Sequence, residues 1–285
     1  MASRCEAGCP RIGTGRVLCR GLGRELEAGR VGGLGLPGMR YVECSPPADL
    51  GGVVDAFWIV EGGVGDRIRV VPDGCTDLID AGTGSVWFNG PMSRGEIVEL
   101  RVATTRGVRL APGTLLTLGA VGDLRALRDG GTRVMVPAWA SGADRSGEHV
   151  ARELLRNGVL VRDGDVDAVL AAFAGAPRRL LAEIYAELGL RERHVQRLFD
   201  RYVGLSPKQT RQVLRHSGVA RALRVGDDGL ATLAAAHEYA DQAHLSRDYR
   251  RLAGVSPGGY RREFDVVGFV QDDADRSLQN ESSPT

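Results

Sequence analysis

The side chains in this sequence that could do chemistry together are arginines and glutamines, and they gather in two similar segments. HVQRLFDRYVGLSPKQTR begins at His194, and HLSRDYRRLAGVSPGGYR begins at His244. Seven of the 18 aligned positions are identical at an offset of 50 residues. A guanidinium can bridge O6 and N7 of guanine, a glutamine amide can pair with N6 and N7 of adenine, and arginine also binds phosphate. The pattern indicates nucleic-acid recognition.

Candidate base contacts lie near the N-terminal half of the second helix expected in each segment, opposite its apolar stripe. They are Arg193, Gln196 and Arg197 in the first segment and Gln242, His244 and Arg247 in the second. Candidate phosphate contacts, which position a protein without reading sequence, are Arg201, Arg211, Arg250, Arg251 and Arg261. The alternative for each arginine is a solvated surface side chain. For His194 and His244, which share a repeat position, the alternative is capping or packing.

The first segment belongs to a pair of helices, because its apolar residues recur at three- and four-residue spacing. Pro177 suits the first turn of one helix, and Gly189 can end that helix in a left-handed conformation. A second helix is expected over residues 191–203, and Gly204 ends it. A helix, a tight turn and a second helix make the helix-turn-helix arrangement.

The second segment repeats this logic after the breaker GDDG at residues 226–229. Asp241 is the expected N-cap of its second helix, and Gly254 ends that helix. Ser-Pro pairs at 206–207 and 256–257 start a further helix after each copy. The first of these helices joins the two copies.

The helix that joins the two copies determines how they can be placed on a ligand. Gly218 inside it should weaken the helix by roughly 1 kcal/mol relative to alanine. Two copies are too few for a propeller or a solenoid. Two recognition helices on one connector can instead enter successive major grooves, roughly 34 Å apart on one face of a duplex.

The repeated region resembles the DNA-binding domain of AraC-type bacterial transcription regulators over residues 177–264. The resemblance rests on ERHVQRLF…VGLSP and on YADQAHLSRDYRRLAGVSPGGYRREF. It implies a double helix-turn-helix domain, base or phosphate contacts at the candidate positions, double-stranded DNA and RNA polymerase as partners, and activation as the favoured mode. The stretches VVPDGCTDLI, FNGPMSR and GVRLAPG also resemble an N-terminal domain of unknown chemistry that is fused to such domains.

Three residues depart from the pattern of that family. Tyr185 stands where a small alanine is usual at the helix crossing, and Arg191 replaces the usual serine cap. Glu238 stands at the usual turn glycine, where a non-glycine residue in left-handed backbone costs on the order of 1 kcal/mol. We therefore expect slightly reshaped units, and the operator sequence cannot be transferred from relatives.

Residues 39–112 are expected to form a small antiparallel sheet or barrel, because short β-branched and aromatic runs alternate with Gly, Pro and Asp. The runs are DAFWIVEG, RIRVVP, TDLIDAG, SVWFNGP, EIVELRV and RGVRLAP. Helical spacing of apolar residues then predicts helices over 113–127, 146–158 and 165–175.

With 285 residues, the chain is long enough for two domains. The predicted fold class is α+β: a small N-terminal β-sheet or barrel-like domain with following helices, then an all-α double helix-turn-helix domain. We expect a disordered leader or start-site artefact over 1–38, an effector or assembly domain over 39–160, the DNA-binding domain over 163–264, and a disordered tail over 265–285.

Charge and cysteine content indicate which class of partner and which cellular compartment to expect. Residues 178–262 hold 15 arginines and one lysine against nine acidic residues, although the whole chain carries only +1. This basic region favours a polyanion partner or, equally, a charge-laced helical surface. Five cysteines, all within the first 75 residues, make a poor disulfide framework, so a reducing cytoplasm is expected. The sequence shows no membrane span and no signal peptide.

Catalysis in the N-terminal region would lack its usual side chains. The first histidine is His149, so residues 39–148 contain neither an imidazole metal site nor a Ser-His-Asp relay. Carboxylate catalysis through Asp73, Asp77 and Asp80 stays open, although PDGCTD is typical of a turn leading into a strand. Cys5 and Cys9 are a weak metal motif. We expect no enzyme activity, cofactor or metal.

Three further residues could line a ligand pocket or fill the core, namely Trp58, Trp87 and Phe88, and the core is favoured. Cys75 could be a thiol sensor, but a buried structural cysteine is the default.

These observations predict a cytoplasmic, sequence-specific transcription regulator whose N-terminal domain modulates the DNA reader. That domain could bind a small-molecule effector or a protein partner, form a homodimer, or serve assembly alone. The alternative is a DNA-repair or DNA-modification protein with a borrowed DNA-binding domain, which would need an activated cysteine. RNA binding is disfavoured, because the basic region lacks aromatic stacking platforms.

Overall fold

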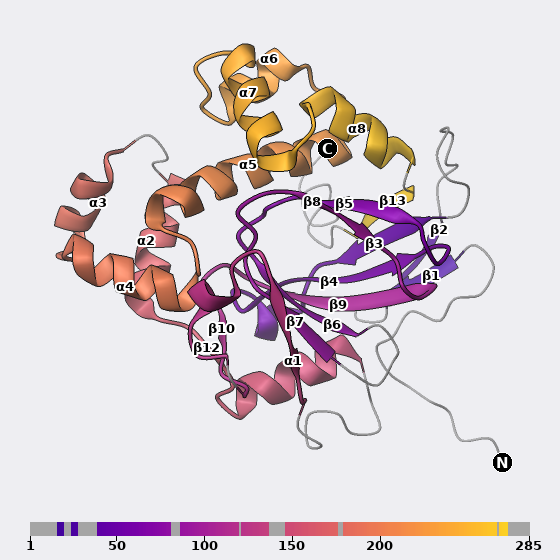
Figure 1. The fold of residues 1–285 in the computed structure, drawn as a ribbon, viewed down its shortest axis with the longest axis horizontal. Coiled ribbons are helices and arrows are strands. Elements are labelled where there is room, and N and C mark those ends of the chain that lie inside the picture. Colours follow the sequence, from indigo (N-terminus) through magenta and orange to yellow (C-terminus); the bar gives the residue numbers. More distant parts are fainter. Residues whose placement is uncertain are drawn as a thin grey trace, which may run out of the picture.

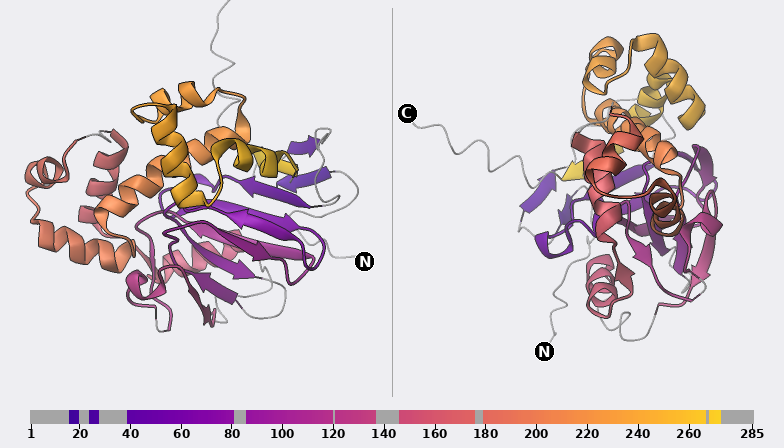
Figure 2. Two further views of the ribbon diagram at one scale, coloured as in Figure 1. Left: turned by 45° about the horizontal axis from the view of Figure 1, so that its top comes forward. Right: turned by 90° about the vertical axis from the view of Figure 1, so that its left-hand side faces the viewer.

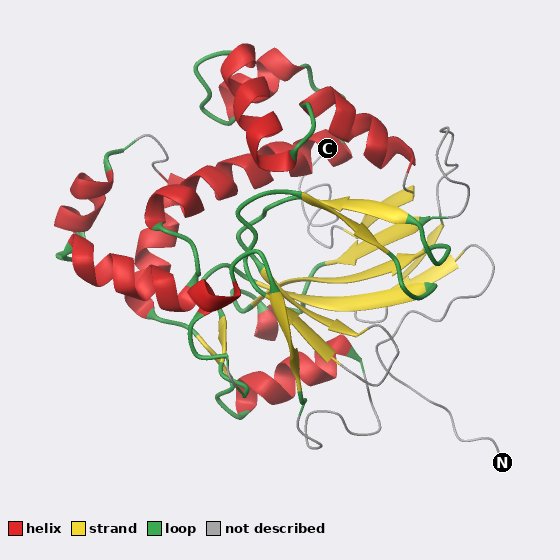
Figure 3. Ribbon diagram, viewed as in Figure 1, coloured by secondary structure: helices red, strands yellow, loops and turns green. Residues whose placement is uncertain are grey.

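The computed structural model describes residues 16–19, 24–27, 39–80, 86–119, 121–136, 146–175, 179–266 and 268–272. Strands dominate the first half of the described chain and helices the second (Figures 1 and 3). The predicted α+β class, with a strand-rich N-terminal domain and a helical double helix-turn-helix domain, is confirmed.

A seven-stranded sheet forms the centre of the strand-rich domain. Its strands are β3 (Arg40–Cys44), β4 (Val54–Glu61), β6 (Thr76–Asp80), β7 (Val86–Asn89), β9 (Thr104–Leu110), β11 (Gly131–Val134) and β13 (Gly268–Asp272). They follow the order β11-β7-β6-β9-β4-β3-β13, and every neighbouring pair is antiparallel except β3 and β13.

Three small antiparallel ribbons accompany the sheet. They are β5 (Arg67–Val70) with β8 (Glu96–Glu99), β10 (Leu115–Leu116) with β12 (Leu160–Val161), and β1 (Arg16–Cys19) with β2 (Arg24–Glu27). All six runs that the sequence predicts as strands between residues 55 and 112 are therefore observed as β4 to β9.

The helix predicted over residues 113–127 is wrong. This stretch forms β10 and the short 3-10 helix η2 (Leu124–Leu127). Gly113 and Gly119 have φ of 86° and 61°, and this left-handed backbone interrupts a helix. The leucines recur at the spacing of a helix, but they pack in the hydrophobic core beside the sheet without forming one.

The two chain ends lie mostly outside the described residues. Within the predicted leader the structure describes the β1–β2 ribbon, and within the predicted tail it describes β13, neither of which the sequence indicated. β13 pairs with β3 in parallel, with Gly268 opposite Arg40 and Asp272 opposite Cys44. The domain boundaries at 39–160 and 163–264 stay a prediction.

The two faces of the sheet pack against different partners. One face covers α1 (Gly147–Arg156), and there Phe88, Leu110 and Leu154 are fully buried. On the other face, Tyr41 and Val60 join buried side chains of the helical domain in a single hydrophobic core. The two domains thus share a core, so the sheet and the helical domain are stabilised together.

In the part of the chain that the structure describes, seven helices follow α1. They are α2 (Gly164–Gly175), α3 (Leu181–Glu187), α4 (Glu192–Tyr202), α5 (Pro207–Val225), α6 (Leu230–Ala236), α7 (Gln242–Ala253) and α8 (Pro257–Val266). No helix within the described ranges is long and apolar enough to cross a membrane.

The helix ends confirm the predicted signals. Ser206 caps α5 in a capping box, and Asp241 accepts a hydrogen bond from the His244 amide at the start of α7. Gly189, Gly204 and Gly254 all have left-handed backbone just after α3, α4 and α7. Pro177 lies outside the described residues, and the prediction that it stands in the first turn of this helix is wrong, because α3 begins at Leu181 with Leu180 at its N-cap.

The two helix-turn-helix units lie at opposite ends of α5. Figures 1 and 2 show α3 and α4 at one end and α6, α7 and α8 around the other. Phe199 of α4 packs on Phe173 of α2 in the core of the first unit, whereas Tyr249 of α7 lies in the core shared with the sheet. The first unit is therefore built on α2, and the second on the strand-rich domain.

Candidate nucleic-acid interface

The helices α4 and α7 each have a buried face and an exposed basic face. Val195 and Phe199 are buried on one side of α4, while Arg193 and Arg197 are exposed on the other. Leu245 and Tyr249 are buried on the equivalent side of α7, while Gln242, Arg247 and Arg250 are exposed. The structure thus leaves most of the predicted base contacts available to a ligand.

Three of the six base-contact candidates already have polar contacts within the domain, namely Gln196, Arg197 and His244. The Gln196 amide donates to Oδ1 of Asp200 at 3.1 Å. Nδ1 of His244 accepts from the Ala240 amide at 3.4 Å, and its ring meets the Tyr239 ring edge-on at 5.2 Å. His244 therefore has the capping and packing contacts that were the alternative to base contact.

The repeat-equivalent His194 has different neighbours. Its Nε2 lies 3.1 Å from Oδ2 of Asp165 on α2, and its Nδ1 lies 3.4 Å from the Arg197 guanidinium. The two copies of the repeat thus share a histidine in sequence but not in its contacts. In the first copy, His194 thus links Arg197, a candidate base contact, to Asp165 on α2, the helix that precedes the repeat.

The five phosphate candidates separate into exposed and engaged side chains. Arg201 and Arg250 are exposed, and Arg251 pairs with Asp248 at 2.5 Å. Arg211 donates to the Arg179 carbonyl at 2.6 Å, and Arg261 to the Asp228 carbonyl at 2.8 Å. A guanidinium that already bonds a carbonyl or carboxylate has fewer free donors for phosphate, so Arg201 and Arg250 are the stronger candidates.

Both turns between the paired helices use left-handed backbone. Gly189 has φ of 66° in the first unit, and Glu238 has φ of 57° in the second. The unusual Glu238 therefore occupies the strained position that the sequence indicated. Gly218 has a role that the sequence did not show, because a Cβ there would lie 2.8 Å from the His237 ring of the second turn.

The strand-rich domain binds the C-terminal end of α4. Nε of Arg128 donates to the Gly204 carbonyl at 2.8 Å, and Arg125 on η2 pairs with Asp200 at 3.1 Å. Gly204 lies two residues beyond Tyr202, the last residue of α4, so Arg128 attaches the turn that follows the helix to the strand-rich domain.

The same domain binds the equivalent end of α7. The Gly95 amide donates to the Leu252 carbonyl at 2.5 Å, and Arg69 donates to the Ala253 carbonyl at 3.2 Å. Arg69 also forms a two-point ion pair with Glu263 of α8, at 2.7 and 3.2 Å. Sequence reasoning missed all of these residues, since they lie 75 to 194 positions from their partners.

The connector α5 is also attached to the strand-rich domain. Nδ1 of His216 lies 3.2 Å from the Pro72 carbonyl, and the imidazole stacks on Tyr249 with 4.4 Å between ring centroids. Burial lowers the pKa of His216 to about 4, so the ring is neutral at physiological pH. A neutral Nδ1–H can donate to the carbonyl of the neighbouring domain.

Asp73 and Asp77, two of the three candidates for carboxylate catalysis, lie close to the buried side chain of Arg109. Arg109 lies 3.2 Å from Asp73, 3.6 Å from Asp77 and 3.5 Å from Glu43. Burial raises the pKa of Asp77 to about 6, although Arg109 opposes the shift. Asp80, at the end of β6, has no ion pair with Arg109. Arg109 thus offsets part of the carboxylate charge on this face of the sheet.

The aromatic and cysteine predictions are only partly correct. Phe88 is buried as expected, but Trp87 is 43% exposed and does not belong to the core. Nε1 of Trp58 donates to Asp77 at 2.6 Å. Cys75 is buried, and burial raises the pKa of its thiol, which is the reverse of an activated nucleophile. Cys5 and Cys9 lie outside the described residues, and no metal-binding cluster occurs within the described ranges.

Comparisons with known proteins match the two halves separately. Residues 184–263 match a helix-turn-helix domain, and residues 42–129 match a domain of unknown function (DUF6597). No curated protein matches the chain.

Among solved structures, ToxT from Vibrio cholerae aligns with this chain at 12% identity and a TM-score of 0.42, covering 79% of this chain and 97% of ToxT. A structure of wild-type ToxT bound to an unsaturated fatty acid aligns at 11% identity and a TM-score of 0.42, covering 84% and 99%.

Proposed function

We propose that this chain, a DNA-binding transcription regulator with an AraC-type helix-turn-helix domain, reads DNA by placing α4 and α7 in successive major grooves of one duplex. One observation carries the proposal: two equivalent helices lie at opposite ends of α5, and each exposes arginine on its solvent face. Arg197 and Arg247 are then the reading side chains, with guanine edges as preferred partners.

The strand-rich domain is proposed to control how the two reading helices are presented. Arg128 and Arg69 bond the C-terminal ends of α4 and α7, so the positions of both helices depend on one domain. A small-molecule effector, a protein partner or a second copy of the chain that changes this docking would change DNA affinity. RNA polymerase would then be recruited in the cytoplasm, with activation as the favoured outcome.

The experiment is selection of bound duplexes from a random DNA pool, with Arg197→Ala and Arg247→Ala tested alongside the wild type. We expect two half-sites about one helical turn apart, and each variant should lose roughly 1–3 kcal/mol at one half-site only. Arg106→Ala is the matched control, because Arg106 is exposed on β9. Salt-sensitive binding without an enriched sequence, unchanged in both variants, would refute the proposal.

A further inference from the structure

Asp200 connects a candidate base contact on α4 to the strand-rich domain. It follows Gln196 by one helical turn, so the two side chains are neighbours on one face of the helix. Oδ1 of Asp200 accepts a hydrogen bond from Nε2 of Gln196 at 3.1 Å, and Oδ2 pairs with Arg125 of η2 at 3.1 Å. The two oxygens of one carboxylate thus contact two different domains.

The contact with Asp200 restricts what the Gln196 amide can read. A free glutamine amide has two N–H donors and one acceptor oxygen, so it can pair with N6 and N7 of adenine or donate its hydrogens to O6 and N7 of guanine. A carboxylate only accepts hydrogen bonds, so Asp200 takes up one of the two hydrogens. One donor and one acceptor remain, and this combination matches adenine but not guanine.

We propose that Asp200 is a positioning residue that makes Gln196 selective for adenine. It acts through the Gln196 amide and not through a DNA contact of its own, because its negative charge disfavours an approach to the phosphates. The inference deepens the proposed function and rests on it, since α4 must lie in the major groove for Gln196 to reach a base edge.

Arg125 offsets the cost of placing a carboxylate on a face that reads DNA. An unpaired negative charge there would repel the phosphates, whereas the ion pair with Arg125 compensates it. The side chain of Arg125 is 64% exposed, and an ion pair this exposed adds little to stability. Movement of η2 away from α4 would therefore leave Asp200 uncompensated without unfolding the helix. Docking of the strand-rich domain is thereby coupled to DNA affinity at the half-site read by α4.

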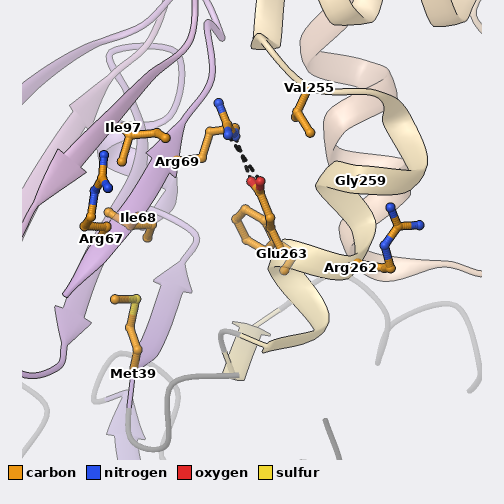
Figure 4. A pocket seen from close by; sticks show the side chains of 10 residues that line it. Met39, Arg67, Ile68, Arg69, Ile97, Val255, Gly259, Arg262 and Glu263 are labelled. Carbon is orange, nitrogen blue, oxygen red and sulfur yellow. Dashed lines mark hydrogen bonds and ion pairs between the residues drawn. The ribbon is translucent and has the colours of Figure 1, made fainter. Parts of the chain in front are cut away.

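The second copy of the repeat has different residues at the equivalent positions. Ser246 and Arg250 stand there, so these positions cannot form a pair between a carboxylate and an amide on α7. In this copy, Arg69 of the strand-rich domain pairs with Glu263 of α8, which is not a reading helix (Figure 4). The inference therefore predicts an effect of Asp200 at one half-site only.

The test measures base preference with the full chain and variants of the selected operator. Gln196→Ala first identifies the base pair that Gln196 reads. At that base pair we expect the wild type to favour adenine over guanine by about 10-fold, and Asp200→Ala to reduce this preference by at least about threefold. Glu192→Ala is the matched control, because it removes an exposed carboxylate from the same helix. It should raise affinity for all sequences, as Asp200→Ala does, without changing the preference.

Double variants separate positioning from a structural role. In the Gln196→Ala background, Asp200→Ala should leave the remaining base preferences unchanged, and Asp200→Ala alone should leave the half-site read by α7 unchanged. Arg125→Ala should weaken binding of the operator by at least about threefold, and this loss should largely disappear when Asp200 is also replaced by alanine.

An unchanged adenine preference in Asp200→Ala would overturn the inference, as would an equal loss of preference in Glu192→Ala or a loss at both half-sites. Base preferences that Gln196→Ala leaves unchanged would also overturn it, while the proposed function would still be supported by the effects of Arg197→Ala and Arg247→Ala. A chain that enriches no sequence would refute the proposed function, and this inference with it.

Discussion

The Arg128 guanidinium donates a 2.8 Å hydrogen bond to the carbonyl oxygen of Gly204, just beyond the C-terminus of α4. One repeat later, Arg69 donates to the carbonyl of Ala253 at the end of α7. Two unrelated parts of the strand-rich domain thus bond carbonyls one position apart in the repeat, at the C-terminal ends of α4 and α7. Because the opposite, N-terminal halves carry the candidate base contacts, this docking leaves the reading surfaces exposed while fixing the helices that carry them.

The first prediction concerns the bond between Arg69 and α7. Arg69→Ala leaves the Ala253 carbonyl and Glu263 without this partner, so we expect a loss of roughly 1–3 kcal/mol in the free energy of unfolding. Arg67→Ala removes an exposed arginine of the same strand and should change it by less than about 0.5 kcal/mol. Urea denaturation measures both values. Equal stability of the two variants would show that Arg69 does not hold α7.

A second prediction uses the close approach of Gly95 to α7. A Cβ at Gly95 would lie 2.8 Å from the Ala253 carbonyl oxygen, so Gly95→Ala must push the two backbones apart. We expect faster amide hydrogen exchange at residues 250–254, with exchange in α4 unchanged. Gly122→Ala is the matched control, because nothing lies within 4 Å of the added Cβ. Unchanged exchange in Gly95→Ala would contradict the close docking of α7 on the ribbon.

The elements of the helical domain could be predicted because their signals are local. Ser206, Asp241 and Gly254 act on backbone groups within a few residues, and each has the predicted role. The segment 113–127 failed because leucine spacing indicates burial without distinguishing a helix from a short strand followed by a turn. Two glycines with positive φ, Gly113 and Gly119, flank β10, which pairs with the distant strand β12, and no helix can run through them.

The docking contacts could not be predicted, because each depends on two distant segments meeting. Arg69 and Arg128 are ordinary arginines in an arginine-rich sequence, and nothing near them indicates a helix end as the partner. Glu238 was recognised as a departure from the family, and its backbone is left-handed as expected. Gly218 was interpreted only as a weak point in the helix, since its contact with His237 arises when α6 folds onto α5.

A third prediction separates free from engaged phosphate candidates. Arg250 is exposed without a side-chain partner among the described residues, whereas Arg261 donates to the Asp228 carbonyl. Arg250→Ala should weaken binding to all sequences and reduce the slope of log K against log salt by about 1. Arg261→Ala should change that slope less, because its guanidinium is already engaged. Titration of one operator over a series of salt concentrations checks this order, and a larger slope change for Arg261→Ala would reverse the assignment.

The last prediction concerns the effect of pH on His216, which lies on α5 and is buried against Tyr249 and the Pro72 carbonyl. Its pKa is lowered from 6.5 to about 4 because the folded interior disfavours the charged ring. Between these values the unfolded chain binds a proton that the folded chain does not, so stability falls as pH is lowered from about 6.5 to 4. The shift corresponds to at most about 3 kcal/mol.

His216→Gln removes the titrating group and should give a flatter dependence of stability on pH over this window. Asp77 contributes the opposite slope, because its pKa is raised to about 6 and its protonation favours the folded state. Subtracting the free energy of unfolding of His216→Gln from that of the wild type removes this contribution, since Asp77 is common to both. Urea denaturation at pH 7, 6, 5 and 4 measures the difference, which should shrink steadily as the pH falls. A difference that stays constant across the series would mean that His216 is not held neutral at the contact between the domains.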